Sequence, residues 1–180
     1  MVYKVITSPN FDAVSLAEVK AQLNIESGYT DDDTYLSSKI AVWTKYVEDY
    51  CKIILRDSVI ECRINPIGDV GVFIPSPATA INTITFYKDG ISDTVDVANY
   101  EINTFSDPHV IAPKYGYEWP ENDYIVLNLD CGYADGSLPQ IARDAIIIKV
   151  AEAYDNRGNN QVHHRNDVSE MLKMIRIPTI

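Results

Sequence analysis

The spacing of apolar residues changes twice along this 180-residue chain, and that change limits the folds the chain can adopt. Apolar side chains recur at helical spacing near both ends, between about Leu16 and Cys51 and again between Ile141 and Ile175. From Ser58 to Asp130, β-branched residues separated by Pro, Gly and Asp clusters dominate instead. The pattern predicts an α+β protein, in which a helical body carries an inserted antiparallel β subdomain.

Two helices are expected before the β region and two after it, at about residues 16–23, 32–51, 139–156 and 167–175. Ser15 and Glu18 have the spacing of a capping box, which starts the first helix. The run Asp31-Asp32-Asp33 places negative charge at the positive end of the second helix. Pro139 opens the third helix, because its fixed φ is already helical and it has no amide hydrogen to satisfy. These signals predict a helical body with two N-terminal and two C-terminal helices.

The strands are expected at about residues 59–64, 70–74, 81–87, 95–97, 100–102 and 124–129. Lys88-Asp89-Gly90 is suited to a hairpin turn, since Asp-Gly readily takes positive φ. The segment 107–120 contains too many prolines for a central strand, so we expect a loop with a short edge piece.

A strand, a turn and a helix follow one another between Leu127 and Arg157. Leu127 and Leu129 alternate with polar residues, as a strand with one buried face requires. The candidate turn residues that follow are Gly132, Tyr133, Gly136 and Pro139. The expected division is therefore a helical part over 1–56, a β subdomain over 57–132, and C-terminal helices over 133–180 that pack with 1–56 as one body.

Composition excludes several classes of protein. A net charge of −11 argues against a surface that grips phosphate groups, because such binding depends on Lys and Arg. Cys51, Cys62 and Cys131 lack CxxC spacing, which favours core thiols over a disulfide framework or a zinc site. No apolar run approaches the roughly 20 residues of a membrane helix, so we expect a protein that is made in the cytosol and has no membrane partner.

Motifs for hydrolases, phosphate binding and zinc proteases are absent from the sequence. Three clusters are candidate functional sites. Asp31 to Asp33 could bind a hard cation, His163 and His164 with Asp167 could bind a metal or act as an acid–base site, and His109 and Asp130 with Cys131 could form a thiol nucleophile. Helix-start charge, a polar loop and a core cysteine explain them better. We therefore expect no catalytic residues, no metal and no cofactor.

In order and wording, these elements resemble the head–tail connector (adaptor or head-completion) proteins of tailed bacteriophages, in the longer branch with a β insertion. The matching stretches are 14–23, 31–33 with Ile40, 46–48, 74–84, 87–90, Trp119-Pro120, and 131–135 through Leu138-Pro139 to 154–157. Cys131 stands where an alanine is usual, and the tail after Arg176 is short.

The resemblance implies a structural virion protein that forms a ring below the portal, extends the DNA channel and connects head to tail. Its implied partners are the portal protein, neighbouring copies in a dodecameric ring, and the next connector or tail protein. DNA is expected to pass without specific binding, because an acidic wall does not hold it. The expected contact residues are Trp43, Tyr46, Tyr50, Arg176, Ile177 and Ile180.

Two other functions remain open on the sequence. An acidic adaptor or inhibitor that mimics nucleic acid would bind a basic partner in a salt-sensitive way. A hydrolase would depend on Cys131 and His109.

Overall fold

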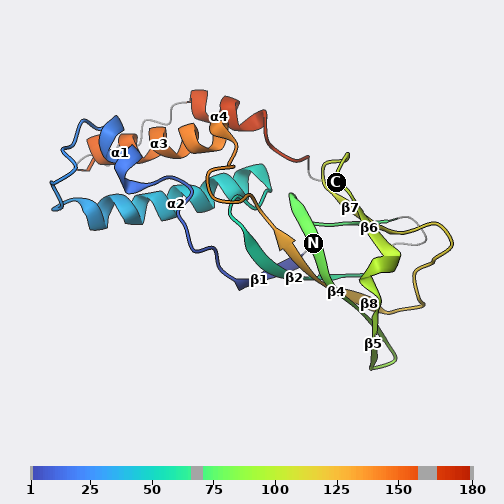
Figure 1. Cartoon of the computed structure of the whole chain (residues 1–180). Coiled ribbons are helices and arrows are strands. Elements are labelled where there is room, and N and C mark those ends of the chain that lie inside the picture. The colour runs from blue at the N-terminus through green and yellow to red at the C-terminus, as the bar shows by residue number, and fades with distance from the viewer. Residues whose placement is uncertain (1, 66–70, 158–165, 179–180) are drawn as a thin grey trace. The chain divides into compact units, whose positions relative to one another are not determined.

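The computed structural model describes residues 2–65, 71–157 and 166–178 and contains four α-helices, a short 3₁₀ helix and two antiparallel sheets (Figure 1). The chain divides into two compact units. A helical unit comprises residues 10–55 and 134–177, and a sheet unit comprises 1–9, 56–133 and 178–180. The fold is thus α+β, as the periodicity predicts.

The helical unit contains α1 (Leu16–Gln22), α2 (Asp33–Cys51), α3 (Gln140–Asp155) and α4 (Asn166–Lys173). Its core is a set of fully buried apolar residues contributed by all four helices: Val19, Leu36, Ile40, Val47, Ala145, Ile146, Val150, Val168 and Leu172. α2 and α3 lie side by side along their length (Figure 1). None of the described helices is long and apolar enough to cross a membrane.

The start of α1 follows the sequence prediction closely. The Glu18 amide donates to Ser15 Oγ at 3.2 Å, and the Ser15 amide donates to Glu18 Oε2 at 2.9 Å. This is the reciprocal capping box that the spacing indicates. The Glu18 carboxylate also pairs with Arg143 of α3, so the cap ties α1 to its neighbour.

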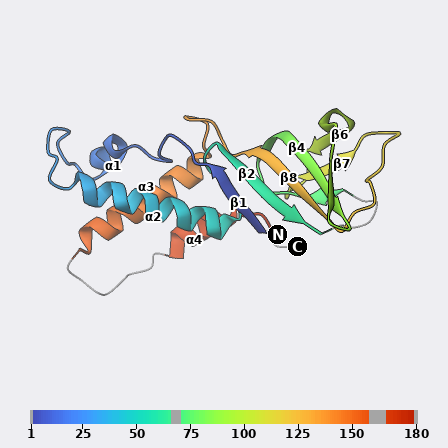
Figure 2. The ribbon, with the colours of Figure 1, turned by 90° about the horizontal axis from the view of Figure 1, so that it is seen from below.

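The sheet unit is built on five antiparallel strands in the order β1-β2-β8-β4-β5, and Figure 2 shows β1, β2, β8 and β4 side by side. They are β1 (Val2–Thr7), β2 (Ser58–Ile64), β4 (Ala78–Lys88), β5 (Ile91–Val95) and β8 (Tyr124–Cys131). Along β8 the buried residues alternate with half-exposed ones, which confirms the predicted alternation. Between β4 and β5, Asp89 and Gly90 both have positive φ, as a tight hairpin requires.

A second sheet has three strands in the order β3-β7-β6, namely β3 (Val72–Phe73), β6 (Tyr100–Asn103) and β7 (Val110–Pro113), with η1 (Val97–Asn99) before β6. The Trp119 ring lies 5.9 Å from that of Phe86 on β4 and 4.9 Å from that of Tyr100 on β6. The two sheets of this unit therefore share an aromatic cluster.

Three local predictions differ from the structure. Val110–Pro113 is the central strand of the small sheet and not an edge piece, because Pro108 precedes the strand and Pro113 is its last residue, so neither interrupts it. The strand expected at 95–97 is β5, which ends at Val95, while Val97 lies in η1. Residues 2–7 form a strand of the large sheet, outside the 57–132 range expected for the β subdomain.

Candidate interaction surface

Three aromatic side chains follow one another along α2. Trp43 and Tyr46 meet edge to face with ring centroids 5.4 Å apart, and Tyr46 stacks on Tyr50 at 6.0 Å. Positions three and four apart share one face of a helix, so the sequence spacing alone produces this row. Val42, one turn before Tyr46, is 54% exposed, and Tyr46 is 38% exposed.

Neighbouring elements of the helical unit hold both ends of this row. The Tyr50 hydroxyl donates to the Ser169 carbonyl of α4 at 3.4 Å, and the Arg176 guanidinium lies 5.2 Å from the Tyr50 ring centroid. At the other end, Lys149 Nζ of α3 lies 5.8 Å from the Trp43 ring. We call the set Val42, Trp43, Tyr46, Tyr50 and Arg176 the aromatic patch.

The aromatic patch carries polar groups that the described residues leave unmatched. Trp43 Nε1 is buried and has no acceptor among them, and a buried donor without a partner is costly. Arg176 is exposed and stacks on Tyr50, with no ion pair to a described carboxylate. A protein surface that buried the aromatic patch could satisfy Arg176 with a carboxylate.

The other two C-terminal residues expected to make contacts have different positions. Ile177 is buried, and its amide donates to the Cys51 carbonyl at 2.9 Å, so this part of the tail packs on its own helical unit. Ile180 lies outside the described residues.

Asp32 joins the start of α2 to the end of α3. Its carboxylate accepts from the Tyr154 hydroxyl at 2.6 Å and from Arg157 at 2.7 Å, and Arg157 also stacks on Tyr154 and Tyr35. These hydrogen bonds hold the pKa of Asp32 at about 2. Asp32 occupies the N-cap position of α2, but its side chain makes no capping hydrogen bond. Within the acidic run, Asp32 therefore makes a long-range contact with α3 and also places negative charge at the start of α2.

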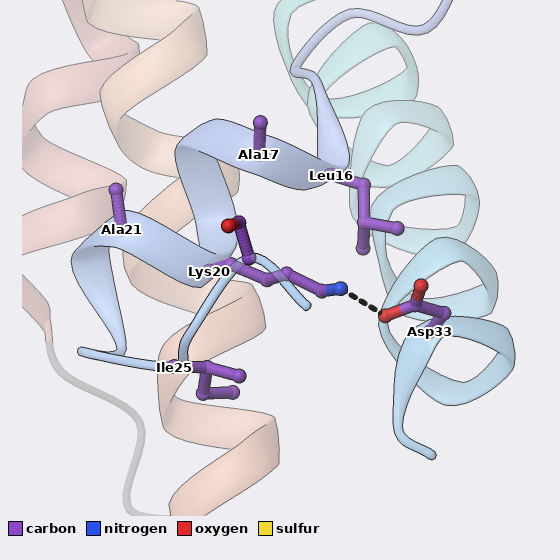
Figure 3. Close-up of a pocket in the computed structure, with 7 residues that line it drawn as sticks. Leu16, Ala17, Lys20, Ala21, Ile25 and Asp33 are labelled. Atoms are coloured by element: carbon purple, nitrogen blue, oxygen red, sulfur yellow. Dashed lines mark ion pairs between the residues drawn. The ribbon is translucent and has the colours of Figure 1, made fainter. Parts of the chain in front are cut away.

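Lys20 and Asp33 form a second link between helices, at the base of a shallow groove of about 430 Å³ (Figure 3). Lys20 Nζ lies 2.5 Å from Asp33 and donates to the Tyr29 carbonyl at 2.7 Å. The remaining lining is mainly apolar, from Leu16, Ala17, Ala21 and Ile25. With its one cation already paired, the groove offers packing and no reactive group.

The turn after β8 depends on Gly132. Its φ is +103°, and a Cβ atom there would lie 2.2 Å from the Arg56 carbonyl oxygen. The Gly132 amide donates to the Pro77 carbonyl at 2.8 Å, and the Tyr133 carbonyl accepts from the Asp57 amide at 3.0 Å. The turn therefore holds three segments of the sheet unit together.

Gly136 also has positive φ but has open space around it. Pro139 is the N-cap of α3, one residue before the position we expected, and its carbonyl accepts the amides of Ala142 and Arg143. Pro139 thus supplies the first acceptor of the helix.

His109, Asp130 and Cys131, the candidate residues for a thiol nucleophile, each have other partners in the structure. His109 Nδ1 accepts the Ala78 amide at 3.1 Å, and the buried Cys131 thiol approaches the Pro75 carbonyl at 3.9 Å. Burial raises the pKa of Cys131 to about 12, which disfavours the thiolate. Asp130, on the opposite face of β8, accepts from Asn82 at 2.6 Å.

His163 and His164 lie outside the described residues, as does the side chain of Asp167. Within the described ranges, no group of three or more His, Cys, Asp or Glu side chains is placed to hold a metal ion.

The comparisons with known proteins agree with this architecture. Residues 13–88 match the model of a family described as phage gp6-like head–tail connector proteins. No curated protein matches the chain by sequence.

Three similar solved structures come from gene transfer agent particles. They are the neck of an empty particle computed with C6 symmetry, with TM-score 0.80 and 16% identity, a native virion, with 0.79 and 16%, and the neck of a native particle computed with C12 symmetry, with 0.78 and 15%. Each alignment covers 100% of this chain and 97% of the other, so the likeness extends over the whole fold.

Proposed function

Since residues 13–88 carry the signature of the phage gp6-like head–tail connector family, we propose that this chain forms a ring below the portal, extends the DNA channel and connects head to tail. The observation that carries the proposal is this family match, together with a fold shared over its full length with subunits of gene transfer agent particles. The role at the head–tail junction, the ring and its place below the portal are all parts of this proposal.

A ring explains the symmetry of the similar particles and the chemistry of this surface. The neck structures that resemble the chain were computed with C6 and C12 symmetry, and we infer a dodecamer on the portal. A closed ring uses a heterologous contact, in which one patch meets a different patch on the next copy. The aromatic patch suits one side of such a contact, because Trp and Tyr anchors with Arg dominate many protein interfaces.

The charge of the chain suits a wall that DNA must pass. At a net −11, the surface repels a phosphate backbone and does not release counterions to bind it. We propose that DNA passes without specific binding, and that the portal and the next connector or tail protein are the tight partners. Catalysis has no part in this role, and the packed His109 and Cys131 side chains support that view. The protein is made in the host cytoplasm and acts in the virion.

The decisive experiment adds the purified chain to cognate portal rings and images the product by electron microscopy. We expect a closed ring of added density on one face of the portal. A Tyr46→Asp variant should weaken this ring, whereas Tyr117→Asp, which changes an exposed tyrosine of the sheet unit, serves as the matched control. If wild-type chain adds no density, and heads made without it package and retain DNA normally, the proposal is wrong.

The same preparations distinguish the acidic adaptor. A nucleic-acid mimic would bind a basic host protein strongly in low salt and weakly in high salt. Such salt-sensitive binding, combined with no portal density, would favour that alternative.

A further inference from the structure

The aromatic patch requires an occupant, and the chain itself carries a segment of complementary chemistry. We infer that the tip of the β4–β5 hairpin of one copy docks on the aromatic patch of the next copy. We define the hairpin tip as Asp89, Gly90, Ile91 and Asp93. The inference rests on the proposed ring and names the two surfaces that would meet in it.

The hairpin tip is the most prominent apolar and acidic projection of the large sheet. Ile91 is 74% exposed, and every residue from Asp89 to Thr94 is exposed. Ile91 and Asp93 lie two positions apart on one strand, so they point to the same face of β5. The tip therefore presents an apolar side chain and a carboxylate together.

The nearby Lys88 is paired with Glu121 and Asp123, and Asp89 interacts with it only at longer range. Lys88 Nζ lies 3.1 Å from Glu121 and 3.9 Å from Asp123, and these acids raise the pKa of Lys88. The Asp89 amide donates to Asp123 at 2.9 Å, which fixes the backbone of the turn. Within the described residues, the structure gives the Asp89 and Asp93 carboxylates no hydrogen bond or ion pair. The hairpin tip is thus rigidly held and still negative.

The aromatic patch supplies the matching groups. Val42 and Tyr46 are exposed apolar contacts for Ile91, and Arg176 is a cation whose guanidinium lies 5.2 Å from the Tyr50 ring centroid. This cation–π contact leaves the guanidinium N–H groups available to a carboxylate. A contact between the two surfaces would pair Arg176 with Asp93 or Asp89 and cover Ile91.

Both units are net acidic, so the charge complementarity that favours a second copy is local, between the acidic hairpin tip and Arg176 of the aromatic patch. The sheet unit carries 12 acidic and 5 basic residues, whereas the helical unit carries 14 and 10. The excess of acid is thus concentrated in the unit that bears the hairpin. Because the two surfaces differ, repeating the contact gives a head-to-tail series that can close into a ring.

The test uses the full-length chain on portal rings with three variants of the contact and one control variant. Arg176→Glu and Ile91→Glu should each weaken ring formation about tenfold, since each removes an anchor from the same contact. Asp93→Arg added to Arg176→Glu should restore ring formation, because the pair is remade with its charges exchanged. Lys114→Glu makes the same charge change as Arg176→Glu, but on the sheet unit and outside the hairpin tip, and it should leave ring formation unchanged.

Mixing the variants gives a second prediction, which holds only if the contact joins two different surfaces. Arg176→Glu retains a working hairpin tip and Ile91→Glu retains a working aromatic patch, so a mixture should give pairs but no rings. In wild-type rings made from a mixture of isotope-labelled and unlabelled chains, we expect cross-links between Lys88 of one copy and Lys45 or Lys173 of another.

The outcomes separate this inference from the proposed function. If wild-type chain forms rings and the Glu variants form them equally well, the docking inference is wrong and the proposed function stands. If the hairpin variants lose portal binding while copy-to-copy cross-links persist, the hairpin contacts the portal and the inference is again wrong. If wild-type chain forms no ring at all, both are wrong.

Discussion

Replacing Gly132 with alanine should destabilise the sheet unit far more than the same change at Gly136. Both glycines have positive φ, of +103° and +75°, so each substitution carries a conformational cost of about 1–2 kcal/mol. Only at Gly132 is there a steric cost as well. The added Cβ would lie 2.2 Å from the Arg56 oxygen and 2.4 Å from its carbonyl carbon, which are backbone atoms that cannot rotate away.

Relief of this overlap requires the β8 turn to move away from residue 56. Such backbone shifts cost about 1–3 kcal/mol. They also stretch two hydrogen bonds, from Gly132 to Pro77 and from Asp57 to Tyr133, each contributing about 1 kcal/mol. Gly132→Ala should therefore lower the free energy of unfolding by about 2–4 kcal/mol more than Gly136→Ala. That difference is a large part of a typical domain stability of about 5–15 kcal/mol.

The two tryptophans allow each unit to be followed separately. Trp119 lies in the sheet unit with Gly132, and Trp43 lies in the helical unit with Gly136. During urea unfolding, fluorescence therefore reports Gly132→Ala in a Trp43→Phe background and Gly136→Ala in a Trp119→Phe background. With a denaturant slope of about 1–3 kcal/mol per molar, the midpoint should fall by roughly 1–3 M in Gly132→Ala. Midpoint shifts from the matching background that agree within about 0.3 M for the two alanine variants would refute the steric argument.

Three further outcomes follow from the described contacts. Because Arg157 and Tyr154 hold the Asp32 pKa at about 2, below its ordinary 3.8, the stability from this carboxylate is complete above about pH 4 and is lost as pH falls toward 2. Urea midpoints of wild type and Asp32→Asn should therefore converge in acid, and a constant gap would contradict this. Burial raises the pKa of Cys51 to about 11 and those of Cys62 and Cys131 to about 12, so an aromatic disulfide reagent near neutral pH should label no thiol of the native chain quickly and three in urea. Labelling of native chain within the mixing time would show that a thiol is accessible. His109→Ala should cost about 1–3 kcal/mol in unfolding free energy by leaving the Ala78 amide without its acceptor, and His109→Asn should recover part of it. Equal losses in the two variants would remove the hydrogen bond from the explanation.

Local signals in the sequence predict local structure well in this chain. Ser15 and Glu18 are three residues apart, and the hairpin at Asp89-Gly90 needs only its own two residues to take positive φ. The alternation in β8 follows from one buried face. In each case the residues that carry the signal are the residues that make the contact, so no knowledge of the rest of the fold was needed.

Features that depend on distant partners could not be predicted. Tyr3 to Thr7 of β1 are all exposed, so β1 has no alternation to detect, and its order comes from pairing with β2 some 55 residues later. Asp32 fits a helix start by its neighbours, whereas its actual partners, Tyr154 and Arg157, follow more than 120 residues later. For the candidate surface, the spacing of Trp43, Tyr46 and Tyr50 indicates one helix face, but nothing in the sequence places Arg176 over Tyr50.

The interleaving of the two units affects how the protein can be made and altered. The chain passes from one unit to the other after residues 9, 55, 133 and 177, so neither unit is a continuous stretch of sequence. On the ribosome, β1 and β2 emerge long before β8, the central strand of their sheet, and α1 and α2 emerge long before α3 and α4. A nascent chain can complete neither unit until most of it has been synthesised, and a shortened product would leave both incomplete. Defective subunits of this kind would therefore be removed as unfolded chains before they could enter the proposed ring and block it.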